Sequence, residues 1–157
     1  MIPSPEPDHP GVIALPPLLF LGFLVGGVVL NLLRPLPISG SSATRIVGGV
    51  LVLVGLSLAI WGRKTMTRSG TNVNPRQPTT ALVVTGPFRY MRNPLYVAMF
   101  IMYIGLALLI NTAWMIFLLA ILFPLMHWGV VLREERYLER KFGETYSRYC
   151  AVTRRWI

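Results

Sequence analysis

One uncharged block of 38 residues, 95–132, constrains the fold of this chain more than any other feature. A single helix of that length would measure about 57 Å, nearly twice the bilayer core of about 30 Å. The block must therefore turn back once, and Asn111-Thr112 is the polar pair near its middle. We expect two membrane-spanning helices, 95–110 and 113–132, joined by a tight hairpin.

Two further apolar segments precede this block. Residues 12–33 form an uncharged run of 22 residues, in which two consecutive prolines fall in the first helical turn, where proline is tolerated. Residues 46–62 form a shorter run of 17 residues, which residues 41–44 would extend. The sequence therefore predicts an all-α, polytopic membrane protein with four transmembrane helices in a single domain, 1–157.

Composition supports the membrane interpretation. Apolar residues make up 54% of the chain and charged residues only 13%, whereas a soluble domain usually carries about 25% charged residues. A net charge of +9 is typical of proteins that bind nucleic acid or an anionic membrane surface, and the hydrophobicity favours the membrane and argues against nucleic acid. The single cysteine, Cys150, excludes an internal disulfide and a cysteine-based metal site, and we expect no bound metal.

The basic residues are distributed unevenly between the two sides of the predicted bundle. With four spans, both termini share a side with the loop 63–93, and that side holds 13 of the 15 Lys and Arg residues. Only Arg34 and Arg45 fall on the other side. Because cytoplasmic loops are enriched in Lys and Arg, we expect both termini in the cytoplasm, with the inner or plasma membrane as the location in a bacterium.

The first polar stretch is 82–96, LVVTGPFRYMRNPLY, directly before the third span. A Thr-Gly-Pro turn signal is followed by two arginines, and Pro94 falls in the first turn of the span, so that Asn93 is predicted to be its N-cap. A helix N-terminus beside arginines suits a carboxylate or a phosphate. The alternative is that these arginines only anchor the helix at anionic headgroups.

The second polar stretch is 133–149, REERYLERKFGETYSRY, after the fourth span, and it holds four of the six acidic residues. We expect the helix to continue past the membrane to about Phe142 and to break at Gly143, giving a cytoplasmic helical extension. Glu135 is placed to pair with neighbouring arginines. The alternative is a solvated helix with surface salt bridges. Two polar residues inside the spans, His127 and Asn31, are candidates for either a structural or a functional role.

Together, these stretches resemble the isoprenylcysteine carboxyl methyltransferase and phospholipid methyltransferase group of integral membrane enzymes. The family run Gly-x-[Tyr/Phe]-x-x-x-Arg-His-Pro-x-Tyr corresponds to 86–96, and Glu-Glu-x-x-Leu corresponds to 134–138. The tail, aromatic-Gly-x-x-Tyr-x-x-Tyr, corresponds to 142–149. The resemblance covers about residues 80–150, with one departure: Asn93 stands where the family usually has histidine.

The resemblance implies methyl transfer from S-adenosylmethionine to a lipophilic, membrane-embedded carboxylate, amine or thiol. It places the cofactor at the cytoplasmic face and makes Arg92 and Glu135 the candidate catalytic residues. Tyr146 and Tyr149 are expected to cover the adenine. The full set of implied cofactor-binding residues is Arg89, Tyr90, Arg92, Asn93, Tyr96, Glu134, Glu135, Tyr146 and Tyr149.

Two other functions remain compatible with the sequence, and the oligomeric state is open. The first is an NADPH-dependent membrane reductase, since the sterol reductases are similar in their C-terminal half, including a Tyr-Cys pair such as Tyr149-Cys150. The second is a small non-enzymatic membrane subunit whose two polar stretches are headgroup anchors. Binding of S-adenosylhomocysteine or of NADP distinguishes the three hypotheses.

Overall fold

The computed structural model describes residues 9–74 and 77–157, and the described part is helical, with no β-strand. The predicted all-α class is therefore confirmed. Residues 1–8, and Pro75 and Arg76 of the predicted loop, lie outside the described residues. The elements in chain order are α1 (Pro16–Leu33), α2 (Ser42–Arg68), the 3-10 helix η1 (Gly86–Arg89), α3 (Pro94–Ile110), α4 (Ala113–Met126), the π-helix η2 (His127–Val131), α5 (Leu132–Phe142) and α6 (Glu144–Val152).

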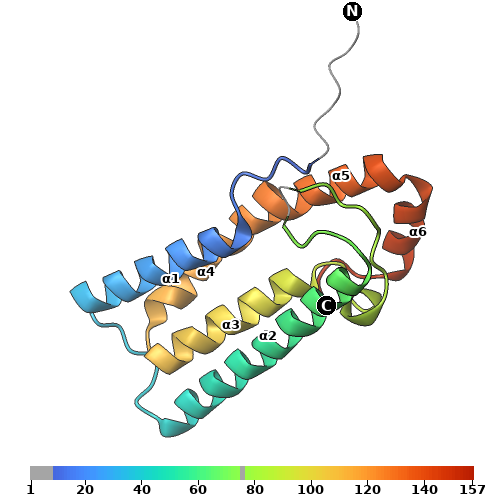
Figure 1. Cartoon of the computed structure of the whole chain (residues 1–157). Coiled ribbons are helices and arrows are strands. Elements are labelled where there is room, and N and C mark those ends of the chain that lie inside the picture. Colours follow the sequence, from blue (N-terminus) through green and yellow to red (C-terminus); the bar gives the residue numbers. More distant parts are fainter. Residues whose placement is uncertain (1–8, 75–76) are drawn as a thin grey trace, which may run out of the picture.

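Helix α2 lies along α3, and α1 lies along α4, so the bundle consists of two packed pairs (Figure 1). At one end of the bundle α5 continues the line of α4, and the loop between α2 and α3 gathers there with α6 (Figure 1). The two polar stretches, far apart in sequence, are thus brought to the same end of the molecule.

Three helical segments are long and apolar enough to cross a bilayer: α1, α2 and the continuous helix Ala113–Phe142. Only 17% of the apolar window of α1 and 11% of that of α2 are buried inside the protein. Apolar side chains that protein does not cover require lipid as their solvent, which makes this an integral membrane protein. Helix α3 is apolar but shorter, with 17 residues, so the four-span arrangement stays a prediction.

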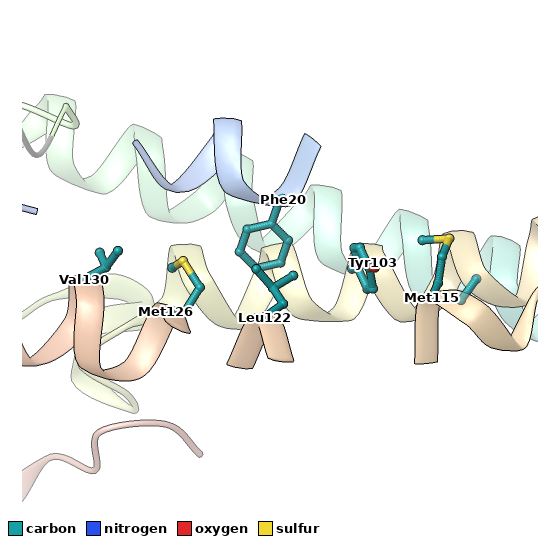
Figure 2. Close-up of a cluster of buried hydrophobic side chains, with 7 residues drawn as sticks. Phe20, Tyr103, Met115, Leu122, Met126 and Val130 are labelled. Carbon is teal, nitrogen blue, oxygen red and sulfur yellow. The ribbon is translucent and has the colours of Figure 1, made fainter. Parts of the chain in front are cut away.

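The core lies between α1, α3 and α4 (Figure 2). Phe20 of α1 contacts Tyr103 of α3 edge to face, with ring centroids 6.1 Å apart. Met115 and Leu122 of α4 are fully buried against the same cluster. Figure 2 shows these side chains in a row between the helices, so α1 is held to α4 and α3 by aromatic and other apolar contacts along its inner face.

The observed helix ends refine the predicted ones. The proline pair Pro16-Pro17 opens α1, as expected. Helix α2 is longer than the predicted 46–62 at both ends, because the Ser41 hydroxyl accepts a hydrogen bond from the backbone N–H of Ala43, at 3.2 Å, and the helix continues into its basic end. Gly143, with φ +50°, ends α5, which confirms the predicted break.

The connection between α3 and α4 is the Asn111-Thr112 pair, and Asn111 adopts the left-handed conformation, with φ +59°. Its side-chain oxygen accepts hydrogen bonds from the backbone N–H groups of Ile38 and Ser39, at 3.0 and 2.9 Å. The same residue therefore makes the turn and holds the loop between α1 and α2 against it.

Close packing of α2 on α3 depends on three glycines spaced seven residues apart, Gly48, Gly55 and Gly62. A Cβ at Gly48 would lie 2.7 Å from the carbonyl oxygen of Gly105, and a Cβ at Gly55 would lie 2.8 Å from that of Ala98. Backbone atoms cannot yield to such contacts as a side chain can. The two helices therefore approach backbone to backbone, as small residues allow in membrane helix pairs.

We predict that Gly55→Ala lowers the free energy of unfolding in detergent by about 1–3 kcal/mol, the usual effect of overpacking. Gly49→Ala on the same helix is the matched control, because a Cβ there meets only the end of the Leu109 side chain, at 4.0 Å. The control should be neutral or slightly stabilising, since alanine is the better helix former. Equal changes in the unfolding midpoints of the two variants would contradict the close backbone approach of α2 and α3 at Gly55.

Candidate active site

A cavity at the polar end of the bundle is lined by the loop between α2 and α3, by the start of α3, and by α5 and α6. Residues 91–96 lead from η1 into α3, with Pro94 at the first helical position. Gly86 begins η1 at φ +59°, and a Cβ there would lie 2.6 Å from the Thr65 hydroxyl oxygen of α2, so this turn is seated tightly on the end of α2. Helices α5 and α6 provide the remaining polar and aromatic walls.

Most of the sequence-predicted site residues line this cavity together. Those that do are Arg92, Asn93, Tyr96, Glu134, Glu135, Tyr146 and Tyr149. Arg89 and Tyr90 do not line it and are exposed on the outer side of η1, Tyr90 by 64%. Apolar side chains also line the cavity, Leu82, Leu95 and Leu138 among them. The cavity thus combines a charged part, called the charged wall below (Arg92, Glu134 and Glu135), with apolar side chains.

Glu135 of α5 lies between two arginines. One of its carboxylate oxygens is 3.0 Å from Arg92 Nη2, and the two side chains are only 15% and 12% exposed. Arg155, near the C-terminus, approaches from the other side, with Nε 2.9 and 3.1 Å from the two carboxylate oxygens and Nη2 2.9 Å from Oε2. The hydrogen bond with Glu135 raises the pKa of the Arg155 guanidinium. These charge-assisted hydrogen bonds fix the position of the carboxylate.

Glu134 makes a different contact. The Tyr96 hydroxyl of α3 donates a hydrogen bond to Glu134 Oε1, at 2.6 Å. The partner of Glu134 is therefore a neutral hydroxyl, whereas Glu135 has two arginines. A negative charge on Glu134 is less compensated than one on Glu135. A carboxylate of this kind on a cavity wall favours a cationic group or a hydroxyl donor in the cavity.

Two buried tyrosines of α6 complete the aromatic part of the site. Their ring centroids, in Tyr146 and Tyr149, lie 6.2 Å apart, and burial raises the pKa of both hydroxyls. The Tyr149 hydroxyl donates a hydrogen bond to the carbonyl oxygen of Phe88 in η1, at 2.6 Å. Both phenols therefore stay neutral, and Tyr149 joins α6 to the loop before α3.

Asn93 occupies the predicted N-cap position of α3, but its side chain makes no capping hydrogen bond. Its amide Nδ2 instead donates to the carbonyl oxygen of Arg155, at 2.9 Å. The backbone N–H of Arg92 donates to the carbonyl oxygen of Arg154, at 2.8 Å. The loop before α3 is therefore bonded to the C-terminal tail, residues 153–157.

Sequence reasoning missed Arg155 and Tyr137. Arg155 entered only the count of basic residues. Tyr137 is 4% exposed, lines the cavity, and accepts a hydrogen bond at its hydroxyl from the backbone N–H of Thr79, at 3.0 Å. An aromatic residue within a highly charged helix was the available signal for Tyr137. For Arg155, which lies 20 residues beyond Glu135, no spacing rule pointed to the pair.

Part of the site has an unused donor. Arg92 Nε is buried and has no hydrogen-bond partner among the described residues, although Nη2 of the same side chain pairs with Glu135. A buried donor of this kind is costly unless something accepts its hydrogen bond. Among the described residues no group of three or more His, Cys, Asp or Glu side chains is arranged to hold a metal ion.

His127 packs among aromatic rings rather than in the cavity. Its ring stacks on Phe123, with centroids 6.2 Å apart, and also contacts Trp128 and Trp156. Asn31 accepts a hydrogen bond from the backbone N–H of Leu36, at 3.4 Å, at the far end of the bundle. These contacts favour structural roles for the two polar residues of the spans.

Comparison with known proteins identifies the family of this chain. The family model "Phospholipid methyltransferase" matches residues 43–145. A nickel-cobalt-cadmium resistance protein of Alcaligenes xylosoxydans xylosoxydans is 38% identical over 66 residues, which cover 42% of this chain and 31% of that protein. No solved structure matches. The family match covers about two thirds of the chain, including the first polar stretch and the Glu-Glu-x-x-Leu run of the second, and the chain therefore belongs to the phospholipid methyltransferase family of membrane proteins.

Proposed function

We propose that this protein transfers a methyl group from S-adenosylmethionine to a lipophilic acceptor that it takes from the bilayer. The family assignment supports methyl transfer in a membrane. The observation that carries the cofactor proposal is the convergence of Arg92, Tyr96 and Glu134 from two distant stretches on one cavity, where Arg92 Nε has no partner.

The residues present suit the chemical groups of this cofactor. A carboxylate would accept the free hydrogen bond of Arg92 Nε, and the less compensated Glu134 would accept hydrogen bonds from an ammonium group or a ribose hydroxyl. Buried tyrosines, Tyr146 and Tyr149, would provide the wall for an adenine ring. When bound, the cofactor supplies an activated methyl group as a sulfonium.

The chain itself is then required to position the reactants and to exclude water. The apolar side chains of the cavity, Leu82, Leu95 and Leu138 among them, suit the tail of a lipid acceptor beside the charged wall. A carboxylate or thiolate acceptor needs no base. An amine that enters as an ammonium ion must first lose a proton, and the Glu134 carboxylate is placed to receive it. Arg92 and Glu135 are proposed as the catalytic pair because Arg92 would contact the cofactor and Glu135 holds Arg92 in place.

We predict that S-adenosylhomocysteine raises the melting temperature of the full chain in detergent, because a ligand that binds only the folded state stabilises it by mass action. NADP at the same concentration should leave the melting temperature unchanged. Stabilisation by NADP alone would favour the reductase, and no response to either ligand would favour the non-enzymatic subunit.

We predict that Glu135→Gln weakens S-adenosylmethionine binding by at least about tenfold, since a lost charge-assisted contact is worth about 1.5–3 kcal/mol. Glu134→Gln should have a similar or smaller effect, because an amide oxygen still accepts from the Tyr96 hydroxyl. Glu144→Gln is the control: this carboxylate is 78% exposed and pairs with Arg148 on the surface of α6. The control should stay within about threefold, as expected of exposed pairs.

Isothermal calorimetry with the cofactor alone measures these affinities without knowledge of the acceptor. Should both Glu134→Gln and Glu135→Gln behave like Glu144→Gln, the carboxylates are not part of the cofactor site.

We also propose that the cofactor cavity faces the cytoplasm, on the strength of the asymmetry in basic residues. In a Cys150→Ser background, Gly40→Cys should react with an impermeant thiol reagent in intact cells, whereas Ser69→Cys should react only after the membrane is opened. Both positions are exposed at opposite ends of the bundle, so burial does not confuse the comparison. The reverse pattern of labelling would mean that the cavity faces the outer side of the membrane.

A further inference from the structure

The C-terminal tail, residues 153–157, is joined to the charged wall of the cavity at several points. It runs beside Met91, with which Arg154 forms an isolated parallel bridge, and the Arg154 carbonyl accepts from the backbone N–H of Arg92. The Arg155 carbonyl accepts from Asn93 Nδ2, and the Arg155 guanidinium holds Glu135. The tail therefore contacts both polar stretches at once.

The end of the tail is anchored among the apolar helices. The Trp156 ring lies 6.1 Å from the Phe100 ring of α3 and 5.4 Å from the Phe123 ring of α4, centroid to centroid. It also contacts His127 at 6.1 Å. An aromatic anchor after Arg155 and backbone hydrogen bonds before it leave the guanidinium little freedom to move away from Glu135.

On these contacts we propose that Arg155 is a positioning residue for the active site, acting on the cofactor through Glu135 and Arg92. This inference rests on the proposed function. Glu135 has two oxygens and one negative charge, and Arg155 contacts both oxygens. With Arg155 in place, Glu135 is held with one oxygen toward Arg92 Nη2, and Arg92 Nε remains free for a ligand. Without Arg155, the carboxylate is free to rotate onto Arg92 and to occupy its remaining donors.

Arg154 provides the matched control. It has the same charge and lies in the same tail, but its side chain is exposed and reaches only the carbonyl of Ile157, at 3.5 Å. The contact that joins Arg154 to the loop before α3 comes from its backbone, which a change of side chain leaves intact. A difference in affinity between the Arg155 and Arg154 variants is therefore due to the Arg155 guanidinium and not to the net charge of the tail.

The experiment measures S-adenosylhomocysteine binding to the full chain in detergent by calorimetry. Arg155→Ala should weaken binding by at least about tenfold, as removal of a charge-assisted contact does. Arg155→Lys should restore part of the affinity, because it keeps the charge but not the paired donors. Arg154→Ala should stay within about threefold of the wild type. When Glu135 is already replaced by Gln, the further change Arg155→Ala should weaken binding by less than about threefold. The effects of residues that act together are not additive.

Each outcome bears on one of the two proposals. Two results would overturn the positioning role while leaving the cofactor proposal standing. One is an unchanged affinity in Arg155→Ala. The other is a loss of affinity from Arg155→Ala that is just as large when Glu135 is already replaced by Gln. Failure of the wild type to bind S-adenosylhomocysteine would overturn both. If Arg155→Ala does not fold, the comparison is made between Arg155→Lys and Arg154→Lys, where a loss of at least about threefold is expected only for the first. Equal affinities in that pair would overturn the inference.

Discussion

The carboxylate of Glu135 is the contact on which the functional end of this molecule depends. It joins three segments that are separate in sequence: the loop before α3 through Arg92, helix α5 on which it lies, and the C-terminal tail through Arg155. A largely buried ion pair contributes little net stability, because desolvation offsets most of its attraction, but removal of one partner leaves an uncompensated charge. Its effect is to fix how the three segments sit relative to one another.

That contact is useful only if α3 itself has a fixed position, and the α2–α3 pair provides it. At Gly48 and Gly55 the backbones of α2 and α3 approach so closely that not even a Cβ fits between them. The first turn of α3 carries Tyr96, so the position of its hydroxyl over Glu134 follows from the register of the two helices. The packing of α2 on α3 thus sets the position of the residues on the charged wall.

Local physics made much of this architecture predictable from sequence. The proline pair at the start of α1, the polar Asn111-Thr112 pair and Gly143 each mark a helix end by their own chemistry, and each stands at one in the structure. Contacts between distant residues were less accessible. The π-helix, the tail contact of Asn93 and the pairing of Arg155 depend on which segments meet in space. The seven-residue glycine spacing of α2 was visible in the sequence and unused, because its meaning appears only with α3 beside it.

The asparagine at the family's histidine position illustrates what the tail contact requires. The contact to the Arg155 carbonyl needs an N–H donor, which both an amide and an imidazole provide. Asn93 therefore keeps the donor and removes a group that titrates near neutral pH. The tail is then held in the same way across the physiological pH range. Any proton that the proposed reaction releases must go to another group, and Glu134, whose contact is the neutral Tyr96 hydroxyl, is the carboxylate that we propose for it, because Glu135 is engaged by two guanidinium groups.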